Sequence, residues 1–303
     1  MKISYDPESE CVSPTTATLG TFDGVHIGHQ ALLKRLVQVA HETNTVSAVL
    51  TFNTHPLAVI RPERAPKLLS TLDEKLAAFA SLGVEQAFVL TFTPETARMQ
   101  SGDFIRRYLL DCLCARNFIA GYDHHFGKDE MHIADRVQEI ARDHHLNIEI
   151  IPPVVVDGTI VKSSLIRSLI HDGSVGKASE MLGYAYSFAG NVIPGRGIGK
   201  TLGFPTANIR MSDADKILPA NGVYAGWIEI GNDRRDAVIA VGPSPTFGLI
   251  EELIEVHIPG YEQDLYANAV RIGFRKRLRD IVKFPAKEEL IRQIRRDIEQ
   301  SGQ

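Results

Sequence analysis

The chain up to Gly183 alternates between two patterns of apolar positions. Short runs rich in Val, Leu, Phe and Thr predict strands at 17–22, 46–52, 86–92, 117–121 and 147–151. Between them, apolar residues recur with a helical period and predict helices at 29–43, 72–82, 94–115 and 134–145, followed by short helices near 164–171 and 174–182. Strands separated regularly by helices imply βαβ units and a parallel, Rossmann-like sheet with helices on both faces.

From Gly183 onward the pattern changes to short β-rich segments that are separated by Gly, Pro and Asn. They read YSFAGNVI, GVYAGWIEI, DAVIAVG, LIEVHI and NAVRIGF, with no long helix between them. This pattern is typical of a small antiparallel barrel. An amphipathic helix is predicted over 285–300, with Leu290, Ile291 and Ile294 on its apolar face. We therefore predict two domains, residues 1–183 and 184–303.

Composition agrees with a folded protein that neither spans a membrane nor is exported. The 303 residues are 44% hydrophobic and 23% charged, which is ordinary for a globular chain. No apolar run approaches the ~20 residues that cross a bilayer. The N-terminal MKISYDPESE has no apolar stretch typical of a signal peptide. The three cysteines, Cys11, Cys112 and Cys114, are too few for a disulfide framework, so we expect reduced thiols and a cytoplasmic protein.

Positive charge is concentrated near the C-terminus. Residues 271–296 contain ten Lys and Arg against three Asp and Glu, whereas the whole chain carries a net charge of −4. A basic stretch of this kind could contact nucleic acid. No aromatic residues alternate with the charges, as base stacking would need. A solvated strand and helix face, or a site for small anions, is therefore the favoured interpretation, and no nucleic-acid partner is expected.

The most informative motif is GTFDGVHIGHQ (20–30), which joins the first predicted strand to the first predicted helix. A helix N-terminus offers unpaired N–H groups and the positive end of the helix dipole. Gly28 would let a phosphate approach the backbone, and His26 and His29 could donate hydrogen bonds to a triphosphate. Two turn histidines that merely cap a helix are the structural alternative. The position after the first strand of a βαβ pattern favours a phosphate site.

Residues 26–29 spell HIGH, a signature that class I aminoacyl-tRNA synthetases share with nucleotidyltransferases. A synthetase would also need an anticodon-binding region and a KMSKS-like loop, for which this chain is short.

Two histidine pairs, 124–125 and 144–145, suggest a metal site at first sight. Neither pair has a third ligand at convincing spacing, so we interpret them as surface or turn residues.

A second glycine-rich run, GRGIGKT (195–201), nearly matches the phosphate-binding P-loop. The register fails because the first glycine of that pattern would fall on Pro194, and Pro205 prevents a following helix. A glycine-rich turn with Arg196 and Lys200 can still bind phosphates through its backbone N–H groups.

Four segments of the first half resemble the FAD-synthetase module of the bifunctional prokaryotic riboflavin kinase/FMN adenylyltransferases. They are GTFDGVHIGHQ, TFNTHP (51–56), GYDHHFG (121–127) and VKSSLIR (161–167). Thr54, His124 and Lys162 depart from the family pattern. Residues 130–133 replace the family's R-x-G-D, so this loop has lost a cation and a glycine. The loss predicts slower FAD formation than FMN formation.

The second half resembles the riboflavin kinase module over GRGIGKTLGFPTANI (195–209), with the P-T-A-N core intact. In that family the Thr and Asn of the core hold Mg²⁺, which implies a metal role for Thr206 and Asn208. Glu255 matches the family's candidate general base; an outward strand carboxylate is the structural alternative. GVYAG (222–226), VGPSPTFG (241–248) and RLRDIVKF (277–284) also fit, although Ile281 stands where the family usually has glutamate.

The resemblance implies a nucleotidyltransferase domain followed by a riboflavin-kinase barrel, with riboflavin, FMN and ATP as substrates and Mg²⁺ as the metal. No tightly bound cofactor and no membrane are expected, and the protein would be a monomer or weak homo-oligomer. The adenylyltransferase residues would be catalytic His26, His29 and Arg167; nucleotide-binding Gly20, Phe22, Gly24, Gly28, Ser163 and Ser164; and flavin-binding His55, Pro56, Asp123 and Phe126. The kinase residues would be Glu255 as base, Gly195, Gly197, Gly199 and Lys200 at the nucleotide, and Thr206 and Asn208 at the metal.

Two alternatives remain at this point. The first is an active riboflavin kinase joined to a weak or silent adenylyltransferase, which the changes at 130–133 and Lys162 would explain. The second is a flavin- or nucleotide-binding regulator without turnover. The intact P-T-A-N core and Glu255 weigh against the second alternative.

Overall fold

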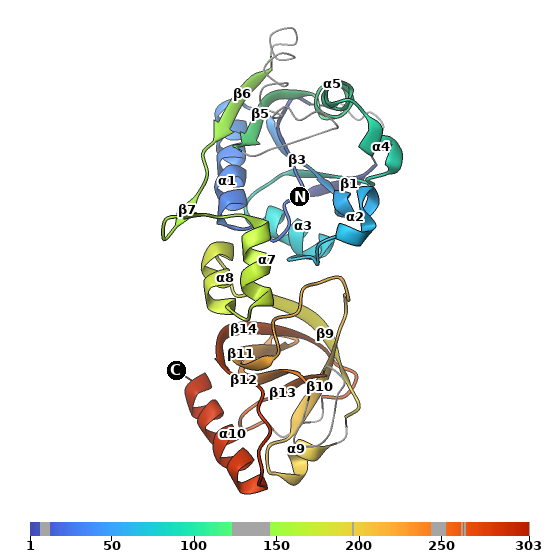
Figure 1. Ribbon diagram of the computed structural model, residues 1–303. Helices are drawn as coiled ribbons and strands as arrows, with labels where there is room; N and C mark the ends of the chain where they lie inside the picture. Colours follow the sequence, from blue (N-terminus) through green and yellow to red (C-terminus); the bar gives the residue numbers. More distant parts are fainter. Residues whose placement is uncertain are drawn as a thin grey trace. The chain divides into compact units, whose positions relative to one another are not determined.

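The computed structural model describes residues 1–6, 13–122, 146–195, 197–243, 253–261, 263 and 265–302. Within these residues the chain forms two compact units, Met1–Ser163 and Ser164–Gln303 (Figure 1). In the part of the chain so described, no helix combines the length and apolar character needed to cross a bilayer.

The first unit contains a six-stranded, entirely parallel sheet in the order β1-β4-β3-β2-β5-β6. Its strands are β1 (Lys2–Tyr5), β2 (Thr15–Leu19), β3 (Val46–Phe52), β4 (Gln86–Leu90), β5 (Ala115–Gly121) and β6 (Asn147–Ile151). The predicted parallel sheet is therefore confirmed. Strand β1 was not predicted, because its four residues, KISY, are mostly exposed and carry little apolar signal.

Helices cover both faces of this sheet because neighbouring residues of a strand point to opposite sides. On β3, Val49 packs with α1 (Ile27–Glu42) and α3 (Leu72–Ser81) in one core, which includes Leu33 and Phe79. The next residue, Leu50, belongs to a second core with α5 (Ser101–Phe104) and the π-helical segment Ile105–Cys112. Figure 1 shows α1 and α5 on opposite sides of the strands.

The remaining elements of the first unit are short. They are α2 (Pro56–Ile60), the 3₁₀ turn Pro62–Arg64, α4 (Pro94–Arg98), β7 (Val155–Val156) and β8 (Thr159–Ile160). The prediction of one continuous helix over 94–115 is wrong. Met99 and Gln100 adopt extended backbone and separate α4 from α5, and the following turns are π-helical. The helix predicted at 134–145 lies outside the described residues.

The cysteine prediction also needs a correction. Cys112 is a buried free thiol, as expected, whereas Cys114 takes part in a disulfide. A disulfide requires only two sulfurs that the fold brings together, which counting cysteines in the sequence does not reveal.

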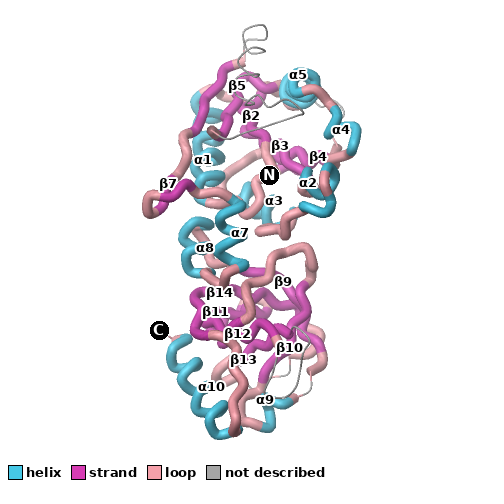
Figure 2. Tube along the Cα trace, in the orientation of Figure 1, coloured by secondary structure: helices cyan, strands magenta, loops and turns pink. Residues whose placement is uncertain are grey.

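The second unit is a closed six-stranded barrel in the order β10-β13-β12-β11-β14-β9, preceded by α7 (Ser163–His171) and α8 (Val175–Leu182). Its strands are β9 (Ser187–Ile193), β10 (Thr206–Met211), β11 (Gly222–Ile230), β12 (Asp233–Gly242), β13 (Leu253–His257) and β14 (Ala269–Arg279). A short helix, α9 (Ile198–Thr201), precedes β10, and α10 (Lys287–Ser301) packs against β11 and β12 (Figure 2). The predicted antiparallel barrel with a C-terminal helix is confirmed.

Candidate active sites

The turn after β2 lies where an open parallel sheet is expected to bind its ligand. Strand β2 has β3 on one side and β5 on the other, so the order of the strands reverses beside it. Ligands of such sheets bind outside the carboxyl ends of the strands at this reversal. Residues 20–26 follow directly from the carboxyl end of β2 and lead into α1. The sequence motif and the topology therefore point to the same place.

The two histidines of the motif lie together at the N-terminus of α1. His26 is the N-cap residue, and its Nδ1 accepts a hydrogen bond from the backbone N–H of His29 at 3.3 Å. The two imidazole rings stack with centroids 3.6 Å apart. A Cβ at Gly28 would lie 3.2 Å from Cε1 and Nδ1 of His26, so the glycine makes room for this capping ring. The arrangement presents two imidazoles at the positive end of a helix, which suits an anionic substrate.

The turn itself is held in a strained conformation. Phe22 and Val25 have positive φ values of 48° and 35°, and such backbone costs a non-glycine residue about 1–3 kcal/mol. Asp23, only 5% exposed, accepts hydrogen bonds at Oδ1 from the backbone N–H groups of Leu69 and Ser70, each at 3.0 Å. These long-range bonds fix the turn in place, since the local backbone alone disfavours it.

The other nucleotide residues predicted for this unit have clear local roles. Phe22 is a core residue, with its ring edge-to-face against His29 and Phe79. Gly24 has a positive φ of 79° and donates its N–H to Ser70 Oγ at 2.8 Å. Ser163 Oγ donates to the backbone oxygen of Asp23 at 2.9 Å, which places the start of VKSSLIR beside the turn. Contact of these residues with a nucleotide stays a prediction.

The predicted flavin residues of the first unit are described only in part. His55 caps α2 by accepting a hydrogen bond at Nδ1 from the Leu57 N–H, and Pro56 occupies the first turn of that helix. Asp123, Phe126 and the loop 130–133 lie outside the described residues, as do the two histidine pairs. Ser164 and Arg167 lie on α7 within the second unit, and their place at this site stays a prediction.

In the barrel, strand register brings the predicted kinase residues together. Strands β10 and β13 are antiparallel, with Thr206 opposite His257 and Asn208 opposite Glu255. Alternate residues of a strand share a face, and directly opposite residues point to the same side. The side chains of all four residues therefore lie on one face of the paired strands β10 and β13. The residue between Glu255 and His257, Val256, is fully buried.

This face continues around the barrel as a row of paired residues. Glu255 is opposite Ala240 on β12, Ala240 is opposite Val223 on β11, and Val223 is opposite Arg279 on β14. The two ends of the row are chemically different, because an amide and a carboxylate stand at one end and a guanidinium at the other. Small apolar residues between them leave space for a ligand.

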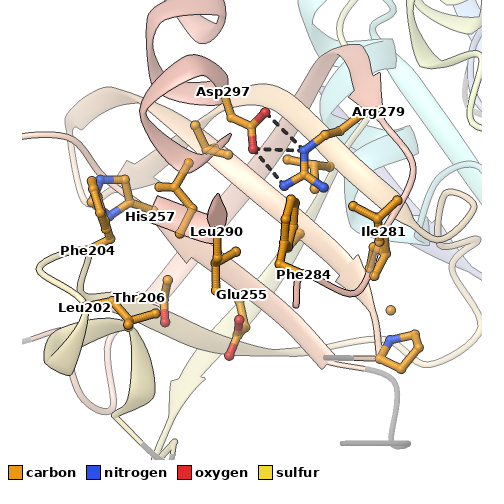
Figure 3. Close-up of a pocket in the computed structure, with 18 residues that line it drawn as sticks. Leu202, Phe204, Thr206, Glu255, His257, Arg279, Ile281, Phe284, Leu290 and Asp297 are labelled. Atoms are coloured by element: carbon orange, nitrogen blue, oxygen red, sulfur yellow. Dashed lines mark hydrogen bonds and ion pairs between the residues drawn. The ribbon is translucent and has the colours of Figure 1, made fainter. Parts of the chain in front are cut away.

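A cavity of about 160 Å³ lies along this row (Figure 3). Its walls come from the barrel strands, from the segment after β14 and from α10. The lining residues are Gly199, Leu202, Phe204, Thr206, Val223, Val238, Ala240, Gly242, Pro243, Glu255, His257, Arg279, Ile281, Val282, Phe284, Leu290, Ile294 and Asp297. The lining is mostly apolar with a few polar groups, which is typical of a site for a small organic ligand.

The carboxyl group of Glu255 lines this pocket. Burial raises the pKa of its carboxyl above the ordinary value, because desolvation disfavours the charged form. Across the pocket, Arg279 Nη2 donates to Oδ2 of Asp297 at 2.8 Å, and Asp297 is only 2% exposed. In the view of Figure 3, this ion pair lies above Glu255. The pair joins β14 to α10 and thereby fixes the helix over the pocket.

The Arg279–Asp297 pair was not predicted, because its partners lie in different elements and match no motif. The basic stretch 271–296 was expected to form a solvated face or a site for small anions, and this expectation stays a prediction. Two more of its arginines, Arg275 and Arg277, form ion pairs with Asp236 and Asp280.

The glycine-rich run packs closely on the predicted metal residues. A Cβ at Gly195 would lie 1.8 Å from Nδ2 of Asn208, and a Cβ at Gly199 would lie 2.3 Å from the backbone oxygen of Phe204. Gly197 has a positive φ of 67° with open space around it, and Lys200 is exposed. Arg196 lies outside the described residues. The glycines thus bring the backbone of this turn against Asn208, and the following chain forms β10, so the run is not a P-loop.

Comparison with known families agrees with both sites. Residues 8–165 match the family model of FAD synthetase, and residues 182–303 match that of riboflavin kinase. The chain belongs to the bifunctional riboflavin kinase/FMN adenylyltransferase family. It therefore phosphorylates riboflavin to FMN and adenylylates FMN to FAD, with ATP as the nucleotide substrate. Residues 166–181, which form most of α7 and α8, fall between the two family matches.

Relatives are similar over almost the whole chain. The bifunctional riboflavin kinase/FMN adenylyltransferase of Listeria monocytogenes is 33% identical over 283 residues, covering 92% of this chain and 88% of the relative. The enzyme of the same name from Escherichia coli is 30% identical, covering 97% of this chain and 93% of the relative.

A solved structure from Streptococcus pneumoniae superposes with a TM-score of 0.90 at 29% identity, covering 99% of both chains. That structure is described as a macrolide-efflux protein. For this chain, both family matches and the named enzymes agree on flavin chemistry.

Proposed function

We propose that Glu255 is the general base of the kinase reaction in the barrel pocket. A ribityl hydroxyl is a poor nucleophile until its proton is removed during attack. Glu255 would take that proton while the hydroxyl oxygen bonds to the γ-phosphorus of ATP and ADP leaves. The raised pKa makes this carboxylate a stronger base than an exposed one. The observation that carries the proposal is that Glu255 lines a mostly apolar pocket and that strand register sets it opposite Asn208.

The same register supports a Mg²⁺ site at Thr206 and Asn208. Their side chains share one face of β10, and the backbone at Gly195 lies against Asn208. Neutral hydroxyl and amide oxygens are suitable ligands for this hard cation, so the residues present fit the metal. Bound Mg²⁺ would supply charge to neutralise the transferred phosphate. Gly197, Gly199 and Lys200 would contact the nucleotide from the adjoining turn.

In the first unit, we propose that His26 and His29 stabilise charge during adenylyl transfer. The phosphate oxygen of FMN attacks the α-phosphorus of ATP, and pyrophosphate leaves. Because that phosphate is already an anion, no base is needed, and catalysis consists of positioning and charge stabilisation. Arg167, Ser163 and Ser164 would assist at the phosphates, and His55 and Pro56 would adjoin the flavin. We further propose a cytoplasmic monomer or weak homo-oligomer, and a domain boundary at 183/184.

The Glu255→Gln variant tests the proposal most directly. We expect FMN formation to fall by about 10²–10⁴-fold, the usual effect of losing a general base, while FAD formation from supplied FMN continues. The assay incubates the protein with riboflavin or FMN, ATP and Mg²⁺ and separates FMN and FAD by chromatography. Glu229→Gln on β11 is the matched control. Equal loss of both activities in a folded Glu255→Gln variant would contradict the assignment.

A further inference from the structure

A buried lysine lies beneath the histidine turn of the first unit and belongs to none of the motifs. Lys75, the fourth residue of α3, is only 7% exposed. Its Nζ donates hydrogen bonds to the backbone oxygens of Thr21 and Phe52, each at 3.0 Å. Thr21 belongs to the strained turn, and Phe52 is the last residue of β3. One ammonium group therefore ties together the carboxyl ends of two neighbouring strands where the nucleotide is proposed to bind.

The lysine acts on the same turn as Asp23. Asp23 anchors the turn to Leu69 and Ser70, just before α3, whereas Lys75 anchors it to α3 itself. Burial lowers the pKa of Lys75 to about 8, and the nearby Asp23 charge opposes this shift. Lys75 is therefore mostly charged at neutral pH, and each buried charge partly compensates the other. The two anchors hold Phe22 and Val25 in backbone that these residues would otherwise avoid.

We propose that Lys75 is a positioning residue for adenylyl transfer, acting through the 20–26 turn on His26 and His29. This inference rests on the function proposed above for the two histidines. The hydrogen bonds to Thr21 and Phe52 set the direction in which the turn leaves β2, and hence where α1 presents the imidazoles. Reactive groups that are displaced by about 1 Å can cost 10²-fold in rate, so an anchor of this kind affects turnover even in a folded protein.

The chain offers a matched comparison in the second unit. Lys216 is also buried, at 4% exposure, and donates to the backbone oxygen of Ser187 at 2.7 Å. It lies over the ring of Tyr186 and does not line the kinase pocket. Lys216 is therefore a buried lysine outside the kinase pocket, against which the effect of Lys75 can be measured.

The test compares Lys75→Met, Lys75→Arg and Lys216→Met in the full chain, with thermal unfolding measured for each. We expect Lys75→Met to lower kcat for FAD formation from FMN by about 10–100-fold at a temperature where it is folded, with little change in KM for ATP and normal FMN formation. Lys75→Arg, which keeps charge and donors, should recover most of that kcat. Histidine Cε1–H resonances assigned to residues 26 and 29 should shift in Lys75→Met and not in Lys216→Met.

Normal kcat for FAD formation in folded Lys75→Met, or an equal loss in Lys216→Met, would overturn the inference. Should Lys75→Met fail to fold, Asp23→Asn/Lys75→Met removes both buried charges and is compared with Asp23→Asn alone. A further loss of kcat in the double variant sustains the inference, and equal rates overturn it. A His29→Ala variant in the same assay distinguishes failure of the Lys75 inference from failure of the proposed histidine site. If His29→Ala is slow and Lys75→Met is not, the inference alone fails; if His29→Ala is normal, the proposed site fails.

Discussion

The two candidate sites are assembled by different physical means. In the barrel, the ladder of backbone hydrogen bonds sets Asn208 opposite Glu255 and continues the row to Arg279. In the first unit, the strained turn depends on hydrogen bonds to residues far away in the sequence: the Asp23 carboxylate accepts from the Ser70 N–H, and Lys75 Nζ donates to the Thr21 backbone oxygen. A site positioned by strand register depends mainly on its own strands, with the Arg279–Asp297 pair as one added support from α10. A site built on a strained turn depends on its supports as well as its reacting groups.

The largest expected effect on the comparison between the two sites comes from a substitution of His29. We expect His29→Ala to reduce FAD formation by about 10²-fold or more, similar to the loss of a single charge-stabilising donor, with riboflavin phosphorylation nearly unchanged. Steady-state rates with supplied FMN measure the effect. His41, which is exposed in the last turn of the same helix, provides the control variant His41→Ala. A normal FAD rate in His29→Ala would leave the histidine pair with only its capping role.

A smaller effect is expected at the metal residues of the barrel. Asn208→Ala should raise the Mg²⁺ concentration for half-maximal riboflavin phosphorylation by at least about 10-fold, since even outer-shell partners of metal ligands contribute 10–100-fold. A Mg²⁺ titration of the initial rate checks this. Asn191→Ala, on the exposed side of the neighbouring strand β9, is the control. An unchanged titration would show that the P-T-A-N segment has only a structural role here.

The smallest expected effect is a difference in pH dependence between the two reactions. The kinase base must be deprotonated, and burial raises the pKa of Glu255. As pH falls, riboflavin phosphorylation should therefore begin to decline above the ordinary glutamate pKa of about 4.3. Adenylyl transfer does not use Glu255, so its own acid limb, which protonation of the FMN phosphate sets at about pH 6, should not follow that of the kinase reaction. The measurement is kcat as a function of pH for both reactions on one preparation. The same acid limb in both reactions would contradict the assignment of Glu255 to the kinase reaction alone.

The sequence predicted the site in the barrel more completely than the site in the first unit. Motif residues Thr206, Asn208 and Glu255 are close because strands align them, and alternation along a strand is visible in sequence. The long-range anchors Lys75 and Asp297 could not be predicted in this way, because each acts on a residue in another element. The same limit explains the missed strand β10: its first residues follow a proline and resemble a turn until β9 and β13 pair with them.

Closure of the barrel also has a consequence for how the protein folds during synthesis. Strand β9 begins the ring, yet its partner on one side is β14, so that Ser187 must find Gly273. The barrel therefore cannot close until nearly all of the chain has left the ribosome. The strands described in the first unit all end by residue 160, so this unit can fold earlier, since domains fold as units in order of synthesis. Pairings between strands so distant in sequence form slowly, so the kinase half is the later and more vulnerable half to fold.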